Sequence, residues 1–186
     1  MSKHIDYEIN RELGECYLFM GEMDKAAEYY QKAVDCGTGH TEPFFGLAAV
    51  AIQKGELKEA GRHYLAALEL APSDKALVGL GLVFMEEGAD DEAFIHMDKA
   101  LELNAANIMA LNALIRLAYK LSRVDEIIPR LSAALDGEDN ESVRFTLAGC
   151  LSYLGRNDAA MEELKILLGK NPGHTDAQEL YAHIAA

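Results

Sequence analysis

The sequence has few residues that would break the chain into separate domains or cross-link it. Only four prolines occur among 186 residues, and no low-complexity segment or linker divides them. We therefore predict one continuous domain over residues 1–186. The three cysteines are an odd number at no metal or disulfide spacing, which argues against a secreted, disulfide-bonded framework.

Membrane and export signals are also missing from the sequence. No stretch approaches the roughly 20 apolar residues that a membrane-spanning helix needs. The N-terminal segment MSKHIDYEIN has no apolar core of the kind found in signal peptides. We expect a cytoplasmic, bacterial protein that does not insert into membranes.

Positive charge is scarce in this sequence. Lys and Arg together number 17 against 31 Asp and Glu, so the formal net charge is -14 at pH 7. Such a protein repels a phosphate backbone or an anionic membrane unless a local basic patch intervenes. The sequence therefore predicts no nucleic-acid partner.

What the sequence does contain is a repeat. Five leucines recur 33 or 34 residues apart, and four of the five are followed by a small residue. These leucines are Leu13, Leu47, Leu80, Leu114 and Leu147. A second column, placed where a helix must end and the chain must reverse, holds glycine in four of five copies. It consists of Gly21, Gly55, Gly88, Ser122 and Gly155.

These columns resemble those of the tetratricopeptide repeat family, whose unit is 34 residues with small, aromatic and proline positions in this order. The resemblance extends from Tyr7 to the C-terminus. It implies an all-α fold, a right-handed α-solenoid of antiparallel helix pairs with about eleven helices. The expected units are 7–40, 41–73, 74–107, 108–140 and 141–174, followed by a capping helix at 175–186.

The fourth unit departs from this pattern. Ile115 and Ile127 stand where other units have small residues. Ser122 replaces the turn glycine, and Pro129 enters the second helix. Because a proline in a helix interior costs about 3 kcal/mol, we predict that this helix kinks or starts late. The fourth unit is therefore expected to be the least tightly packed part of the array.

No cluster of residues predicts catalysis or a metal site. Cys16, Cys36 and Cys150 fall in columns that hold Val or Leu in other units, so we interpret them as small core residues. His63 and His96 take matching positions on second helices without other ligands at metal spacing, and we assign them to a solvated outer face. Motifs such as GxGxxG and GxSxG do not occur. The sequence predicts no enzyme activity, no cofactor and no metal.

The clearest functional signal is a surplus of apolar residues on two first helices. In the second and third units, one face of the first helix supplies the core, yet the opposite face is apolar as well. A helix that is apolar all round is expected to be covered all round. The two extra stripes are Phe45, Ala49 and Ile52 in the second unit and Val78, Leu82 and Met85 in the third.

The family resemblance implies that first helices line a concave side, so these stripes would form the floor of a binding groove. In the fourth unit, Arg116 and Lys120 are four residues apart on one helical face and indicate a cationic anchor. The alternative is a solvated face balanced by Asp125 and Glu126. The residues predicted to bind a partner in this unit are Asn112, Arg116, Tyr119 and Lys120.

Three interpretations of the stripes stay open at this point. They form an open groove for an amphipathic helix or extended hydrophobic segment of another protein, they are covered by a second copy, or they belong to the core. The leading functional hypothesis is a non-catalytic scaffold for protein–protein interaction. The alternatives are a secretion-type chaperone that holds a single client and a self-assembling scaffold, with a homodimer as its simplest form.

Overall fold

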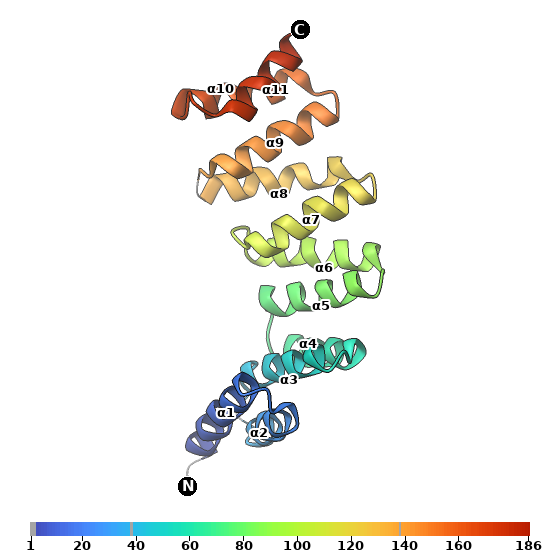
Figure 1. Cartoon of the computed structure of the whole chain (residues 1–186), viewed down its shortest axis with the longest axis vertical. Coiled ribbons are helices and arrows are strands. Elements are labelled where there is room, and N and C mark those ends of the chain that lie inside the picture. The colour runs from blue at the N-terminus through green and yellow to red at the C-terminus, as the bar shows by residue number, and fades with distance from the viewer. Residues whose placement is uncertain (1–2, 38, 138) are drawn as a thin grey trace. The chain divides into compact units, whose positions relative to one another are not determined.

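Figure 1 shows the computed structural model of the chain, whose described residues are 3–37, 39–137 and 139–186. Over these ranges the chain forms eleven α-helices and no strand. The helices are α1 (Lys3–Phe19), α2 (Met23–Asp35), α3 (Glu42–Gln53), α4 (Leu57–Leu70), α5 (Asp74–Glu86), α6 (Asp90–Leu103), α7 (Ile108–Lys120), α8 (Val124–Gly137), α9 (Glu141–Tyr153), α10 (Asn157–Lys170) and α11 (Thr175–Ala185). The predicted all-α fold of paired helices is confirmed.

The chain divides into two compact units near the predicted boundary between the third and fourth repeats. Unit 1 spans Met1–Leu103 and holds α1 to α6. Unit 2 spans Asn104–Ala186 and holds α7 to α11. That the two units act as one continuous domain stays a prediction.

Every turn from a first helix to its second helix contains a residue with left-handed backbone in the predicted column. Gly21, Gly55, Gly88 and Gly155 have φ angles between 71° and 78°. Ser122 takes the same conformation with a φ angle of 57°, although a side chain disfavours it. The fourth repeat therefore makes the same turn as the others despite its missing glycine.

Pro129 lies inside α8 and not at its start. The helix begins at Val124 and continues through the proline to Gly137, so the predicted late start is wrong. The proline occupies the second turn, where it removes only one backbone hydrogen bond. Ile127 and Leu131 are buried on either side of it, and their burial offsets the loss.

Polar side chains cap several first helices. The Oγ atom of Ser73 accepts a hydrogen bond from a backbone N–H of α5, and the Oδ1 atom of Asn107 does the same for α7. Asn140 caps α9 in this way. Such bonds satisfy donors that the first turn of a helix leaves free, so they define where these repeats begin.

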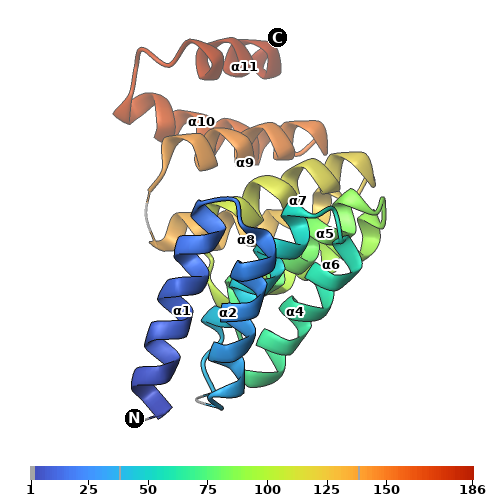
Figure 2. The ribbon, with the colours of Figure 1, turned by 60° about the horizontal axis from the view of Figure 1, so that its bottom comes forward.

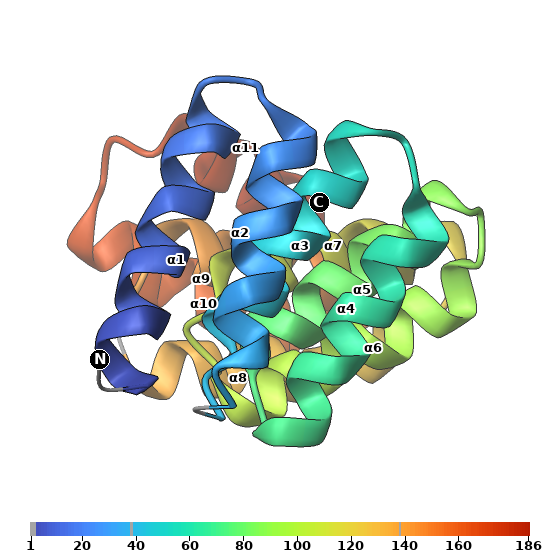
Figure 3. The same ribbon diagram turned by 90° about the horizontal axis from the view of Figure 1, so that it is seen from below.

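In unit 1, tyrosines of second helices pack over glycines of first helices. The ring of Tyr30 in α2 lies so close to Gly14 in α1 and Gly46 in α3 that a Cβ added at either glycine would lie 2.8 or 2.3 Å from it. The ring of Tyr64 in α4 meets Gly79 in α5 in the same way. Figures 2 and 3 show the neighbouring helices α1 and α2 side by side, and α4 beside α5. Glycine at these positions lets each ring lie between two helices.

Unit 2 packs leucines at the repeat positions where unit 1 has these tyrosines. Leu131 in α8 and Leu164 in α10 occupy that column, and both are fully buried. Leu164 belongs to a core cluster that also includes Ala148 in α9 and Ala177 in α11. The last helix therefore closes unit 2 through apolar contacts, as expected of a capping helix.

A group of ion pairs links the two helices of the last repeat. Arg144 in α9 contacts Asp139 at 2.9 Å and also contacts Glu163 in α10. Lys170 at the end of α10 reaches the same Asp139. The side chain of Arg144 is largely buried, so these contacts are less screened by solvent than ordinary surface pairs.

Charged residues also meet at the turns between successive repeats of unit 1. At the first junction, Lys54 after α3 donates a hydrogen bond to Asp24 in α2 at 2.6 Å. At the second junction the equivalent residues are Glu87 after α5 and Lys58 in α4, which line one hollow. The two junctions thus carry the same pair of charges with the signs exchanged.

The three cysteines lie in different environments. Cys150 is buried, Cys36 is half-buried and Cys16 is exposed. The prediction of a core residue is confirmed for Cys150 and wrong for Cys16. In α3, α5 and α9 the column of Cys16 is covered by the preceding second helix, whereas no described helix precedes α1.

Candidate protein-binding surfaces

The apolar stripes predicted on α3 and α5 are partly open to solvent. Ile52 in α3 is 44% exposed and Leu82 in α5 is 37% exposed. Phe45, Ala49 and Met85 are half-buried. These five residues form the α3–α5 surface, and their own unit does not enclose them.

Val78 is the exception among the predicted groove residues. It is only 3% exposed and lies in a run of buried residues from Ala76 to Gly81. Helices pack on α5 from both sides, because α4 and α6 both contact it. Val78 is therefore core, and its assignment to an open groove is corrected.

Tyr64 joins the α3–α5 surface although the sequence did not indicate it. Its ring centre lies 6.4 Å from that of Phe45 and its edge packs over Gly79, so a second-helix residue reaches the first-helix side. Burial raises the pKa of the Tyr64 hydroxyl, which stays neutral. The available signal was the pair of glycines Gly46 and Gly79, 33 residues apart, which leave room for a ring.

The predicted residues of the fourth repeat lie in unit 2 and form a separate surface. Tyr119 in α7 stacks edge-on against Tyr153 in α9 with ring centres 5.3 Å apart, and both rings are exposed. The Tyr119 hydroxyl lies 3.5 Å from the Cys150 sulfur. Burial, followed by this contact, raises the pKa of the Tyr119 hydroxyl. An aromatic pair held in this way offers a rigid apolar contact.

The polar residues predicted beside this pair are all exposed. They are Asn112, Arg116 and Lys120. Of the carboxylates that were expected to balance them, Asp125 contacts Arg156 and Glu126 contacts Arg123. Within the described residues, Arg116 makes no ion pair. Its guanidinium is therefore available to an acidic group.

The arginine at the start of the chain is already engaged. Arg11 in α1 contacts Glu8 at 3.1 Å, Glu12 at 3.7 Å and Glu15 at 2.5 Å. Its positive charge is therefore held by three carboxylates of its own helix, and the hydrogen bond to Glu8, followed by the charge of Glu15, raises the pKa of the guanidinium. It is not free to bind an acidic ligand.

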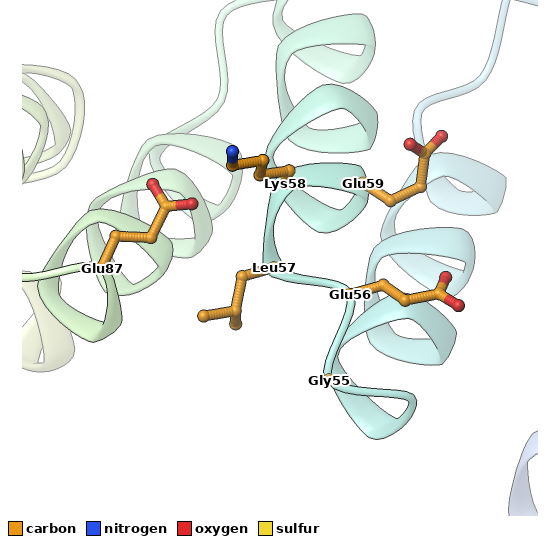
Figure 4. Close-up of a pocket in the computed structure, with 6 residues that line it drawn as sticks. All are labelled: Gly55, Glu56, Leu57, Lys58, Glu59 and Glu87. Carbon is orange, nitrogen blue, oxygen red and sulfur yellow. The ribbon is translucent and has the colours of Figure 1, made fainter.

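A hollow lies at the turn between α3 and α4. It has a volume of about 560 Å³ and is lined by Gly55, Glu56, Leu57, Lys58, Glu59 and Glu87. Figure 4 shows Glu56 and Glu59 extending to one side of the start of α4, while Glu87 and Leu57 lie on the other. The carboxylates are spread around the rim and do not converge on a point, so the hollow has no catalytic arrangement.

The histidines have local contacts. His63 is half-buried, with Nε2 3.9 Å from Glu59, and burial lowers its pKa. The ring of His96 lies 5.1 Å from that of Phe84. His63 is therefore less exposed than the predicted solvated outer face would make it. Over the described ranges, no group of three or more His, Cys, Asp or Glu residues is arranged to hold a metal ion.

A membrane-spanning helix is also absent from the described part of the chain. None of the helices there combines the length and the apolar character needed to cross a bilayer.

Sequence comparison identifies the repeats. Models of the tetratricopeptide repeat match residues 8–35 and residues 45–108. The chain is a tetratricopeptide repeat protein. Members of this family are generally non-enzymatic scaffolds for protein–protein interactions.

Solved structures of tetratricopeptide repeat proteins share the α-solenoid fold. MamA matches with a TM-score of 0.65 over 92% of this chain and 94% of that chain, at 17% identity. YrrB, a TPR protein with an unusual peptide-binding site, matches with a TM-score of 0.61 over 91% of this chain and 89% of that chain, at 19% identity. At such identities the likeness shows the fold alone.

A longer protein shares part of the sequence. BBSome complex member BBS4 of Bos taurus is 30% identical over 109 residues, which are 58% of this chain and 21% of the bovine protein. The matched segment thus spans about a fifth of that relative's length.

Proposed function

We propose that this tetratricopeptide repeat protein is a cytoplasmic scaffold that binds an amphipathic helix or extended hydrophobic segment of another protein on the α3–α5 surface. The observation that carries the proposal is the exposure of Ile52 and Leu82 on neighbouring first helices, beside the paired rings of Phe45 and Tyr64. Apolar side chains held on rigid helices lose little conformational freedom on binding.

The contacts would be shared among a few side chains. Phe45, Ile52, Leu82 and Met85 would take the apolar anchors of the ligand, which recur at i, i+3, i+4 and i+7 when the ligand is a helix. Burial of each exposed aliphatic side chain contributes about 1.5–3 kcal/mol at most. The ring of Tyr64, which packs against Phe45, would keep the Phe45 side chain in place for this contact.

The exposed residues of unit 2 would form a second contact for the same partner. Arg116 would orient an acidic group, with Asn112 and Lys120 beside it, and Tyr119 would provide apolar area next to Tyr153. The peptide-binding site of YrrB and the complex membership of the bovine relative agree with a binding role.

A peptide library displayed on phage tests the proposal on the intact chain. Selected peptides should carry apolar anchors at helical spacing and should bind the Leu82→Asp variant at least about tenfold more weakly. Leu65→Asp is the matched control, because Leu65 is an exposed leucine on the second helix α4. Equal binding to both variants would remove the α3–α5 surface from the proposal.

A stability control separates binding from folding. Leu82→Asp should keep the helical circular dichroism of the wild type, since its side chain is partly exposed. Leu80→Ala, at a buried position two residues away, should lower the free energy of unfolding by about 2–5 kcal/mol. If Leu82→Asp unfolds the protein instead, this face is core.

A further inference from the structure

One face of α1 is uncovered although the same face is buried in later first helices. Ile9, Leu13 and Cys16 occupy the columns of Pro43, Leu47 and Val50 in α3, and of Ala76, Leu80 and Val83 in α5. All six counterparts are buried, as are Val143, Leu147 and Cys150 in α9. In α1, by contrast, Ile9 and Cys16 are exposed and Leu13 is half-buried.

A preceding helix covers this face in α3, α5 and α9. In unit 1, Leu47 and Val50 in α3 pack against Ala26 and Tyr30 in the preceding helix α2. The next junction is built alike, because Leu80 and Val83 approach Gly61 in α4. The uncovered face of α1 therefore has the apolar positions that a preceding helix covers, but Glu12 stands in the column of Gly46, so there is no room for a ring at the position of Tyr30.

The uncovered face of α1 is also the most apolar exposed part of that helix. Ile5, Ile9, Leu13, Cys16 and Met20 follow one another at spacings of three or four residues, so they form one stripe along α1 and the turn after it. Ile9 is 45% exposed, and Phe19, beside the end of the stripe, is 95% exposed. We call these six residues the α1 outer face.

Carboxylates border the α1 outer face. Glu8, Glu12 and Glu15 each directly precede a residue of the stripe and form a parallel row, with Arg11 as the one cation that contacts them. Asp6 lies on the other side. A second copy placed here would bring the same acidic rows together, in a chain with 31 acidic and 17 basic residues. The charge therefore favours a basic occupant.

We propose that the α1 outer face docks a basic amphipathic helix of a partner protein, in the position that α2 takes on α3. The helix would carry small residues at the spacing of Ala26 and Ala33 and an aliphatic residue between them, as Leu131 is in α8, with Lys or Arg beside them. This surface is distinct from the α3–α5 surface, so the inference is independent of the proposed function.

A designed peptide provides the probe. It has the sequence of residues 22–35, which span α2, with the four acidic residues replaced by Lys, Tyr30 replaced by Leu and a fluorescent label at its end. Its fluorescence anisotropy should rise on titration with the full chain, and the affinity should fall as salt is added because the charges are exposed. A version of the peptide with Glu in place of those Lys residues should bind at least about tenfold more weakly.

Cys16 reports directly on occupancy of the face. Because Cys16 is exposed within the stripe, bound peptide should slow its alkylation by maleimide, whereas the buried Cys150 should react slowly with or without peptide. Ile9→Asp should abolish both peptide binding and protection of Cys16, since an aspartate at the contact is left unpaired. Leu82→Asp should leave both unchanged.

Other outcomes overturn the inference. Protection of Cys16 that grows with protein concentration in the absence of peptide would mean that a second copy covers the face. Loss of peptide binding in Leu82→Asp would mean that the peptide occupies the α3–α5 surface. No binding, or equal binding of the Lys and Glu peptides, would remove the basic helix as the occupant.

Discussion

Unit 1 and unit 2 use the same repeat position in different ways. In unit 1 the position holds Tyr30, Tyr64 and Met97, and each of these side chains lies over a glycine of a first helix. In unit 2 it holds Leu131 and Leu164, which are fully buried and meet no glycine. The same pairing of helices is therefore stabilised in two ways. In unit 1 a bulky side chain packs against a glycine, and in unit 2 a leucine is buried among other side chains.

This difference determines what each unit tolerates. A ring against a glycine leaves no volume for even one extra carbon, so unit 1 depends on glycines that lie within helices. Unit 2 has no such constraint at Gly149, where nothing lies within 4 Å of an added Cβ. Unit 2 instead adds the ion pairs around Arg144. Steric fit dominates one unit, and aliphatic burial with charge pairing dominates the other.

The largest effect is expected from Leu164→Ala in unit 2. Removing this fully buried side chain leaves a cavity and should lower the free energy of unfolding by about 2–5 kcal/mol, measured by urea denaturation. Ile166→Ala on the same helix is the control, because Ile166 is exposed and should change stability by less than about 0.5 kcal/mol. Equal losses would show that the core of unit 2 is not centred on the leucine column.

Gly46→Ala should break the tyrosine–glycine contact of unit 1. The new Cβ would lie 2.3 Å from the buried Tyr30 ring, so we expect a loss of about 1–3 kcal/mol in urea denaturation. Gly149→Ala in α9 is the matched control and should stabilise the protein by about 0.5–1 kcal/mol. Adding Tyr30→Leu to Gly46→Ala should recover part of the loss. A harmless Gly46→Ala would refute the steric account.

Arg144→Met tests the ion pairs of unit 2. The substitution keeps an apolar stem but removes contacts to Asp139 and Glu163, and should lower stability by about 1 kcal/mol at low salt. The loss should shrink in about 1 M sodium chloride, where charges are screened. Arg62→Met removes an exposed pair with Glu59 and should have almost no effect. A loss independent of salt would point to packing of the arginine stem.

The smallest effect is expected at the turn of the fourth repeat. Ser122→Gly relieves a left-handed backbone angle of 57° and should stabilise the protein by about 0.5 kcal/mol after the entropy of the unfolded glycine is subtracted. The reverse change, Gly155→Ser in unit 2, should destabilise by a similar amount. Thermal unfolding of both variants checks the pair, and shifts in the same direction would contradict the prediction.

The repeat made most of the fold predictable. Columns such as Leu80 and Gly55 locate helices and turns because burial and backbone angle act on single residues, and both are visible in a sequence. The late start predicted from Pro129 is wrong because the sequence shows the local cost of the proline but not the burial of Ile127 and Leu131 around it. Tertiary packing decided that position, as it often does for helix propensity.

The candidate surfaces were only partly predictable. Ile52 and Leu82 are exposed as the apolar stripe indicated, but Val78 on the same stripe is buried. Periodicity shows which side of a helix a residue occupies but not how far a neighbouring helix extends over it. Tyr64 was missed for the same reason, since its reach depends on Gly79 in another helix.

The charged residues at the turns distinguish the adjacent repeats of unit 1. Lys54 faces Asp24 at the first junction, and Glu87 and Lys58 take these places at the second. A tandem duplicate of residues 41–73 would set Lys58 of one copy opposite Lys54 of the next, where Asp24 and Lys54 now attract each other. Copying a repeat would thus create repulsion at the new joint. Growth of this array by gene duplication would therefore add a small repulsion at each new joint unless one of the two charges changed sign.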